Sequence, residues 1–247
     1  MRVAAIYDIH GNLPALEAVL AEIRGIGVDQ IVVGGDVVPG PMEREALECL
    51  LALEIPTRFI AGNCEREVLA EMAGNPSSKL PEPIRESMHW AAEELRNERE
   101  RLASWPKTAT VEIDGVGKVL FCHATPRNDN EIFSERTPDE KLLPVFEGVD
   151  ASVVVCGHTH IQFDRRVGKT RVVNSGSVGM PFQEPGAYWL LLCPGVELRR
   201  TSYDLAIAAE RIRATRYPQA EEFAERYVLD PPSKEQMLDV FARAELK

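Results

Sequence analysis

Residues 2–23 read RVAAIYDIHGNLPALEAVLAEI, and this stretch predicts a buried strand that is followed directly by a helix. Arg2–Tyr7 is a short apolar run, as expected for a buried strand. Asn12 then precedes a leucine and Pro14, and a side-chain cap followed by proline in the first turn is a signal for the start of a helix. Gly25 and Gly27 are expected to end the helix that this signal begins.

The same alternation of strand and helix continues to residue 65. Strands are predicted at Gln30–Val33 and Thr57–Ala61, with a helix over Glu43–Leu53 between them. The order βαβαβ implies parallel strands that are joined by right-handed crossovers. The N-terminal part of the chain is therefore expected to form an open α/β sheet.

The second half of the chain has a different pattern. Residues 73–83 are typical of a loop, and Pro83–Trp105 is expected to be one long charged helix. Thr108–Asp114 and Lys118–Cys122 flank two glycines, which predicts a hairpin. Further strands are expected at Ala151–Cys156, Gln162–Val167, Arg171–Asn174, Ala187–Cys193 and Val196–Ser202. The half-alternating polar pattern of residues 162–174 suggests antiparallel pairing.

Amphipathic helices are predicted at Asp204–Arg213 and Lys234–Leu246. We therefore expect an α/β domain over residues 1–203, with a helical insertion at about 73–105, and a helical C-terminal extension over 204–247 packed on the same domain.

Composition and charge exclude several classes of protein. The chain has 247 residues, of which 45% are hydrophobic and 27% charged, and its formal net charge is −11. Such an acidic surface repels a phosphate backbone, so general nucleic-acid binding is not expected. We find no signal peptide and no apolar stretch that approaches the about 18 residues of a membrane helix. The five scattered cysteines fit reduced thiols in the cytoplasm.

The histidines give the first indication of function. Four of the five follow predicted buried strands, in loops that also carry Asp, Asn or Gly, whereas His89 lies on the long helix and is interpreted as a surface or packing residue. In an open α/β sheet, sites lie beyond the carboxyl ends of the strands. Five such loops offer metal-binding side chains: Asp8, His10, Asp36, Asn63, His123, His158 and His160.

Taken singly, most of these residues have a simpler explanation. An Asp-x-His triplet is frequent by chance, and Asp36 after two glycines could cap a turn. Asn63 could be a turn residue because asparagine tolerates left-handed geometry, and a lone His123 is more often a core histidine than a ligand. His158 and His160 are a better signal, since residues two apart on an extended segment project to the same side. The joint occurrence of all seven residues at one end of the strands favours a metal site.

The ligand types favour particular metals. Mixed carboxylate, imidazole and amide ligands suit Mn, Fe, Co, Ni or Zn rather than Ca or Mg, and Mn is our first expectation. Seven ligands are too many for one tetrahedral zinc but suit two divalent ions that share a carboxylate. Ions about 3.5–4 Å apart can clamp an in-line displacement and lower the pKa of a bridging water. Asp36 is the expected bridge because its loop lies between the others.

The motifs D-I-H-G-N (8–12), G-G-D-V-V (34–38), G-N-C-E (62–65), C-H-A-T-P (122–126) and G-H-T-H (157–160) resemble those of the calcineurin-like metallophosphoesterase superfamily. The likeness is greatest to small bacterial phosphodiesterases that carry G-N-C rather than G-N-H. Residues 174–178 resemble the family's closing loop N-P-G-S-V, with Ser175 in place of proline. The resemblance implies a four-layer α/β/β/α sandwich with metals at its top edge.

The resemblance also implies a role for each ligand. One ion would be held by Asp8, His10 and His160, the other by Asn63, His123 and His158, and Asp36 would bridge them. The implied enzyme is a dinuclear phosphoric ester hydrolase in which a metal-bridging hydroxide attacks phosphorus. Its catalytic residues would be Asp36, Asn63 and His123.

One departure from the family pattern bears on the substrate. In the phosphatase branch a histidine follows the asparagine and protonates the leaving group, but this chain has Cys64 there. Glu65 matches the carboxylate that orients that histidine and is left without its usual partner. We therefore expect phosphodiesters with acidic leaving groups rather than monoesters. Asn12, Asn63, Arg127 and Arg66 are candidates to bind the phosphoryl group, since arginine donates two hydrogen bonds to phosphate.

Two alternatives stay open at this point. The first is a phosphomonoesterase or protein phosphatase of the same superfamily, with another group as the acid. The second is a non-catalytic protein-binding scaffold, which predicts eroded ligands, whereas all seven are present. The helical insertion is expected to be a specificity cap, and the C-terminal extension a docking or dimer element, or else both simply cover the sheet. The expected partner is a small phosphorylated substrate, with no membrane association and the homo-oligomeric state left open.

Overall fold

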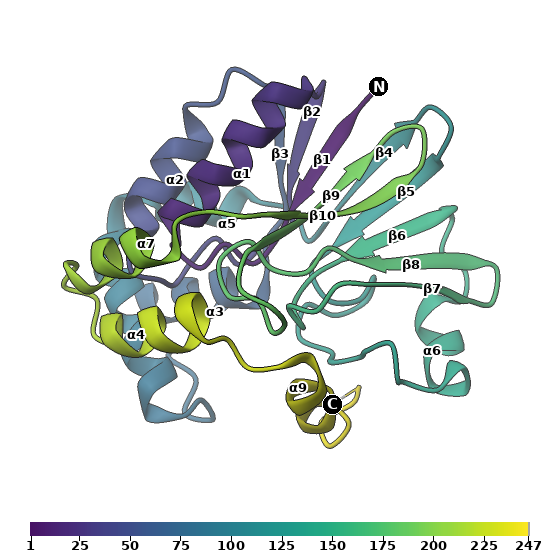
Figure 1. The fold of residues 1–247 in the computed structure, drawn as a ribbon. Helices are drawn as coiled ribbons and strands as arrows, with labels where there is room; N and C mark the ends of the chain where they lie inside the picture. The colour runs from purple at the N-terminus through teal and green to yellow at the C-terminus, as the bar shows by residue number, and fades with distance from the viewer. Residues whose placement is uncertain (247) are drawn as a thin grey trace.

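The computed structural model describes residues 1–246, which form two five-stranded sheets (Figure 1). The first sheet has the strand order β10-β9-β1-β2-β3. Strands β1, β2 and β3 are parallel, as predicted, whereas β9 runs antiparallel to β1 and to β10. The strands of this sheet are β1 (Val3–Ile6), β2 (Gln30–Val33), β3 (Thr57–Phe59), β9 (Ala187–Leu192) and β10 (Val196–Thr201).

The second sheet has the strand order β4-β5-β6-β8-β7. The predicted hairpin is present as the antiparallel pair β4 and β5, and β7 pairs antiparallel with β8. Between these two pairs, β5, β6 and β8 are parallel. The strands of this sheet are β4 (Thr108–Ile113), β5 (Gly117–Cys122), β6 (Val153–Cys156), β7 (Phe163–Val167) and β8 (Thr170–Asn174).

Side chains of β1 alternate between two apolar cores. Ala4 and Ile6 belong to a core that β1 shares with α1 and α2. Val3, Ala5 and Tyr7, which directly follows the strand, belong to the core between the two sheets. This alternation is the geometric consequence of a strand, in which successive side chains point to opposite faces. Because both faces are covered, the whole strand must be apolar.

Helices cover the outer faces of the two sheets (Figure 1). Most of them lie on the first sheet, and a third apolar core joins α6 to the second sheet. The four-layer α/β/β/α sandwich that the motifs implied is therefore confirmed. The helices are α1 (Leu13–Ile26), α2 (Glu43–Leu51), α3 (Asn63–Met72), α4 (Glu82–Glu94), η1 (Arg96–Glu98), α5 (Arg99–Ser104), α6 (Asp139–Phe146), α7 (Leu205–Arg213), α8 (Ala220–Phe223), η2 (Ala224–Leu229) and α9 (Lys234–Phe241).

The prediction of one long helix over residues 83–105 was wrong. The chain leaves helical geometry at Leu95, with φ −106° and ψ 19°, and continues through η1 into α5. Leu95 and Leu102 are both buried in the core beneath these helices. Packing of these two leucines overrides the helical propensity of the charged sequence around them.

The sequence pattern also missed several short helices. Helix α3 begins at Asn63, in a segment that was interpreted as a loop, and α6 is short and contains Pro144. The segment Ala220–Leu229, which lies between prolines, forms α8 and the π-helix η2. Each of these helices is held by tertiary contacts, so the local periodicity that predicts a helix is weak.

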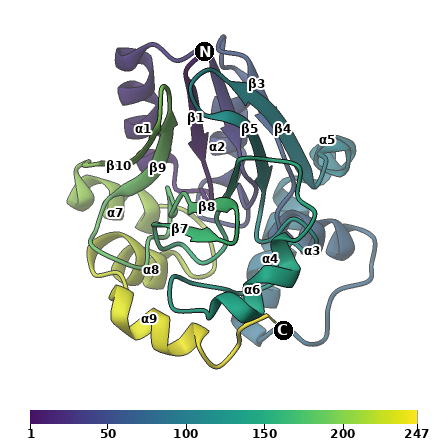
Figure 2. The same cartoon turned by 90° about the vertical axis from the view of Figure 1, so that its right-hand side faces the viewer.

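The C-terminal extension crosses the edge at which both sheets end (Figures 1 and 2). At its start, Arg211 of α7 contacts Glu17 of α1, with 2.7 Å between Nη1 and Oε2. At its end, Asp239 of α9 accepts a hydrogen bond from Arg136, which precedes α6. The domain boundary between residues 203 and 204 stays a prediction. Among the described residues, no helix has the length and apolar character needed to cross a membrane.

Candidate metal centre

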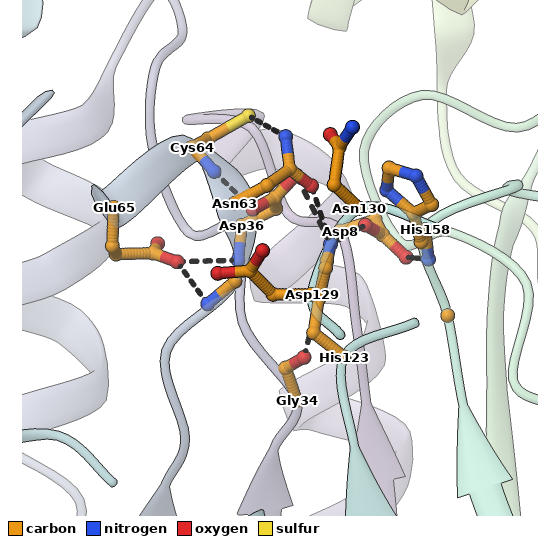
Figure 3. Close-up of polar contacts among 12 residues, drawn as sticks. Asp8, Gly34, Asp36, Asn63, Cys64, Glu65, His123, Asp129, Asn130 and His158 are labelled. Atoms are coloured by element: carbon orange, nitrogen blue, oxygen red, sulfur yellow. Dashed lines mark hydrogen bonds and ion pairs between the residues drawn. The ribbon is translucent and has the colours of Figure 1, made fainter. Parts of the chain in front are cut away.

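All seven predicted ligands lie at the ends of strands along one edge of the sandwich. Asp8 and His10 follow β1, Asp36 follows β2, and Asn63 is the first residue of α3. His123 follows β5, and His158 and His160 follow β6. Figure 3 shows Asp8, Asp36, Asn63, His123 and His158 converging from these separate loops.

The backbone at five of the seven candidate ligands is in the left-handed region. The φ angles are 53° at Asp8, 46° at His10, 52° at Asp36, 68° at His158 and 57° at His160. Residues other than glycine seldom adopt such angles, and each costs of the order of 1–3 kcal/mol unless the surroundings impose it. Backbone hydrogen bonds impose it here, for example from His10 N to Asp36 O at 3.0 Å. Strain concentrated in this way is typical of functional sites.

Two glycines make room for the ligand carboxylates. A Cβ atom on Gly62 would lie 2.1 Å from Asp36 Oδ1, and one on Gly157 would lie 2.3 Å from Asp8 Oδ2. Any other residue at these positions would displace a carboxylate. The glycines before Asn63 and His158 are therefore required by the close approach of backbone to ligand.

The ligand side chains form two clusters. In one, the ligand atoms of Asp8, His10 and His160 all lie within 4.8 Å of one another. The two imidazoles approach to 3.3 Å between their Nε2 atoms, and His160 Nε2 lies 3.4 Å from Asp8 Oδ1. A cluster of one carboxylate and two imidazoles around a common point is a suitable set for a transition-metal ion.

The second cluster contains Asp36, His123 and His158, again within 4.8 Å of one another. His123 Nε2 lies 3.0 Å from Asn63 Oδ1 and 3.4 Å from Asp36 Oδ2. Asp36 Oδ2 also lies 3.9 Å from His10 Nε2, in the first cluster. Asp36 thus contacts both clusters, and Asp8 Oδ1 of the first cluster also lies 3.8 Å from His123 Nε2 of the second.

Unpartnered polar atoms test whether these clusters suit a metal. Asp8 Oδ1 and His158 Nε2 are buried and have no hydrogen-bond partner among the described residues. A buried polar atom without a partner is costly, and a cation in each cluster would satisfy one of these two atoms. The Nδ1 atoms of His123 and His160 donate to the carbonyl oxygens of Gly34 and Met180, at 2.9 and 2.7 Å. These bonds orient each ring so that its Nε2 faces the other ligands of its cluster.

The titration behaviour of the histidines follows from their surroundings. Burial, together with the neighbouring His160, lowers the pKa of His10 to about 4. Burial, together with His123, lowers the pKa of His158 to about 4. Both imidazoles are therefore neutral at neutral pH, which is the form that binds a metal. Burial also acts to lower the pKa of His123, but the Asp36 carboxylate outweighs it and raises this pKa to about 10.

Glu65 has a role that the sequence interpretation missed. Far from lacking a partner, its carboxylate accepts backbone hydrogen bonds from Gly62 at 2.7 Å, Asp36 at 2.9 Å and Val37 at 2.8 Å. It therefore joins the Asp36 loop to the loop that precedes Asn63. Burial, together with the charge of Asp36, raises the pKa of Glu65 to about 7.

Cys64 lies against Asp36, and its backbone N–H donates to Asp36 Oδ1 at 2.9 Å. Its thiol is buried and belongs to a cluster with His10 and Asp36 whose members lie within 4.8 Å of one another. Burial and the Asp36 carboxylate raise the pKa of the thiol well above its usual value. Both effects oppose ionisation, so the thiol keeps its proton in the metal-free chain.

The candidate substrate-binding residues are placed less favourably. Asn12 is fully buried, caps α1 by accepting from Ala15 N, and donates to Gly179 O. The side chain of Arg127 makes a paired contact with Glu131, and that of Arg66 makes one with Asp129. Arg127 lines a small cavity together with the candidate ligand His123. That either arginine binds substrate stays a prediction.

The structure adds a contact to the site that the sequence did not indicate. The ring of Phe182 stacks on the imidazole of His160, with 4.7 Å between centroids and 23° between planes. Phe182 in turn contacts Tyr227 of η2 at 6.4 Å and Phe241 of α9 at 6.1 Å. A row of aromatic rings therefore connects the C-terminal extension to a candidate metal ligand. The closing-loop motif at residues 174–178 was the nearest signal in the sequence.

Residues 1–193 match the calcineurin-like phosphoesterase superfamily domain, and the chain belongs to this superfamily. Its members are phosphoesterases that bind divalent metals, which agrees with the two clusters of His and Asp side chains.

Similar proteins extend the match beyond this domain. The chain is 30% identical over 240 residues to an uncharacterized protein of Methanocaldococcus jannaschii, MJ0912, across 88% of this chain and 94% of that protein. A metallophosphoesterase from Sphaerobacter thermophilus has a TM-score of 0.71 and 26% identity, covering 92% of this chain and 98% of its own. The hypothetical protein PH1004 from Pyrococcus horikoshii has a TM-score of 0.78 at 22% identity, covering 94% and 99%, and shows the shared fold.

Proposed function

We propose that this protein is a dinuclear, metal-dependent phosphodiesterase. The observation that carries the proposal is the pair of ligand clusters that meet at Asp36. Asp8, His10 and His160 would hold one ion, and Asn63, His123 and His158 the other. Manganese is the metal we favour, with Fe, Co, Ni or Zn as alternatives, because imidazole and carboxylate ligands are mixed.

The residues of the chain would do three things in the reaction. The buried carboxylates of Asp8 and Asp36 would neutralise cations, and Asp36 would fix their separation by contacting both clusters. The second oxygen of each carboxylate is held by a backbone N–H, from His158 to Asp8 and from Cys64 to Asp36, at 2.9 Å each. Two divalent ions, when bound, would supply Lewis acidity toward the phosphoryl oxygens and a hydroxide nucleophile at neutral pH.

The preference for diesters rests on the lack of a suitable acid beside the leaving group. General acids work best with a pKa near the working pH, and the pKa of the buried Cys64 thiol is raised well above its usual value. The carboxyl group of Glu65 has a pKa of about 7, but its oxygens accept three backbone hydrogen bonds. An aryl diester needs less protonation of its leaving group and repels a nucleophile less than a dianionic monoester does.

Two measurements on the same preparation test this function. Elemental analysis of protein reloaded with Mn²⁺ should give close to two ions per chain, and that preparation should hydrolyse aryl diesters faster than alkyl monoesters. Equal rates on both ester classes would favour the phosphomonoesterase or protein phosphatase of the same family. A stoichiometry near zero would leave only the protein-binding scaffold.

We further propose a small phosphorylated substrate and a location in the cytoplasm. The net charge of −11 disfavours nucleic acids as general partners. All five cysteines are free in the structure, as thiols are in a reducing compartment. Fractionation of the producing cells would test the location.

A further inference from the structure

A cavity of about 320 Å³ opens directly beside the metal centre. Its lining includes His10, a candidate ligand, and the thiol-bearing Cys64. The volume falls at the lower end of the range of about 300–1,000 Å³ for small-molecule sites. The other lining residues are Pro39, Pro83, Ile84, Ser87, Met88, Met180, Tyr217, Gln219, Glu222, Phe223 and Tyr227.

The two segments outside the motif-bearing core build the walls of this cavity. Helix α4 supplies one side, and the segment from Tyr217 to Tyr227 supplies the other. A hydrogen-bond network joins the two sides: Tyr217 Oη donates to Ser87 Oγ at 2.9 Å, and Ser87 Oγ also contacts Gln219 Oε1. The insertion and the extension are thus held together at the cavity wall.

The chemistry of the lining favours an uncharged occupant. The hydroxyls of Ser87 and Tyr217 already bond to each other, so they present little free hydrogen-bonding capacity. Met88 and Phe223 are buried apolar side chains of the wall, and Ile84 is 43% exposed. The one charged residue among the described lining residues is the acidic Glu222, which is exposed and paired with Arg226. A second phosphate or a carboxylate would find no cationic side chain among the described lining residues.

We infer that this cavity, the α4–η2 cavity, binds the organic group of the substrate, and that this group is an uncharged, mainly apolar substituent of about the size of one ring system. The inference rests on the proposed function, because His10 and Cys64 line the cavity and also belong to a cluster with Asp36 at the metal centre. Substrates with an anionic organic group, such as a second phosphate, are disfavoured because the described lining residues include the acidic Glu222 and no cationic side chain.

Binding of phosphonates, which are not hydrolysed, tests the cavity without the chemical step. We would titrate Mn²⁺-loaded protein calorimetrically with methylphosphonate, phenylphosphonate and 4-carboxyphenylphosphonate. Phenylphosphonate should bind about tenfold or more tightly than methylphosphonate, as one apolar group in a fitted pocket commonly discriminates by about 10–200-fold. 4-Carboxyphenylphosphonate should lose this advantage.

Two variants place the effect in the cavity. Ile84→Glu adds a charge at an exposed position and should abolish the advantage of the phenyl group while methylphosphonate binding is unchanged. Met88→Trp fills the cavity and should do the same, and if it does not fold, Ile84→Glu is sufficient. The matched control is Ile207→Glu on α7, where the parent residue is 56% exposed and does not line the cavity.

The outcomes separate the two proposals. The inference is wrong, and the proposed function stands, if phenylphosphonate binds no more tightly than methylphosphonate. The same holds if 4-carboxyphenylphosphonate binds as tightly as phenylphosphonate, or if Ile84→Glu leaves the preference for phenylphosphonate intact. If no phosphonate binds in a Mn²⁺-dependent manner, the proposed function fails and the inference fails with it.

Discussion

His123 Nε2 lies 3.4 Å from Asp36 Oδ2, although β3, β4, β5 and four α-helices separate the two residues in the chain. The contact is fixed from one side, because His123 Nδ1 donates to the carbonyl oxygen of Gly34, which stands just before the Asp36 loop. The same short loop therefore positions a histidine of the second sheet and a carboxylate of the first.

The position of Asp36 leads to a first prediction. Asp36→Asn should lower activity by about 10²-fold or more, since even residues behind the ligands typically contribute about 10–100-fold. An amide would leave two cations facing each other across a short gap without a neutralising charge. His89→Ala is the control, because its side chain is 66% exposed and pairs with Glu71 away from the clusters. Equal losses in kcat/KM for the two variants would show that the ligand assignment is wrong.

Glu65 gives a second prediction about metal affinity. Glu65→Gln replaces an acceptor oxygen with an amide group that faces backbone N–H groups, so the loops of Asp36 and Asn63 should shift. We expect affinity for Mn²⁺ to fall by about 10–100-fold, as measured by competition with a fluorescent chelator. Glu71→Gln, farther along α3, should bind Mn²⁺ as the parent does. An unchanged affinity in Glu65→Gln would rule out a positioning role.

Metal removal should destabilise the fold. The metal-free centre holds two unpartnered buried polar atoms, on Asp8 and His158, and five backbone positions with positive φ. A metal that is bound only by the folded state at 100 times its Kd adds about 2.7 kcal/mol of stability. For a chain of this size that corresponds to a rise in Tm of roughly 5–10 °C. Calorimetry in the presence of Mn²⁺ and in the presence of EDTA measures this difference in Tm. The difference should be clearly smaller for Asp36→Asn than for the parent.

A buried carboxyl on α2 predicts how stability depends on pH. Burial raises the pKa of Glu43 from its ordinary value of 4.5 to about 8, and its Oε1 has no partner among the described residues. The folded state therefore keeps a proton that the unfolded chain loses, so this residue lowers stability progressively as pH rises from 4.5 to 8.

Glu43→Gln removes this titration while keeping an acceptor for the N–H of Gly40. The difference in Tm between the variant and the parent should increase in favour of the variant from pH 5 to pH 9. At pH 9 the variant should be more stable than the parent by on the order of 1–3 kcal/mol. Glu45→Gln, at an exposed position on the same helix, should give no such trend. A difference in Tm that is the same at both pH values would contradict the assignment to Glu43.

Cys64 determines the expected choice of ester. In the parent enzyme, kcat/KM for a series of phenyl esters should fall steeply as the pKa of the leaving group rises, because no good proton donor is available. Cys64→His should flatten this slope and raise monoesterase activity, since general acid catalysis is worth about 10²–10⁴-fold. Cys49→His, at a half-buried position on α2, is the control. A shallow slope in the parent would point to another acid and to the phosphatase alternative.

The positions of the strands along the chain and the loops that carry the ligands could be predicted from the sequence, because both depend on local patterns. A buried strand has to be an apolar run, and each run here ends at a chemically distinctive residue such as Asp8, Asp36 or His123. Parallel strands place their carboxyl ends at one edge, so listing the residues that follow each strand already collects the candidate ligands.

Contacts between distant segments decided the rest. The break at Leu95, the three backbone partners of Glu65 and the stacking of Phe182 on His160 depend on neighbours that no local pattern specifies. The α4–η2 cavity is the clearest case, because Ser87 and Tyr217 meet across 130 positions of sequence. The sequence by itself determined which residues are the candidate metal ligands, since they are recognised by the type of their side chain and by their position directly after a strand. Only the tertiary structure determined what surrounds them, since packing is a property of segments that meet in space.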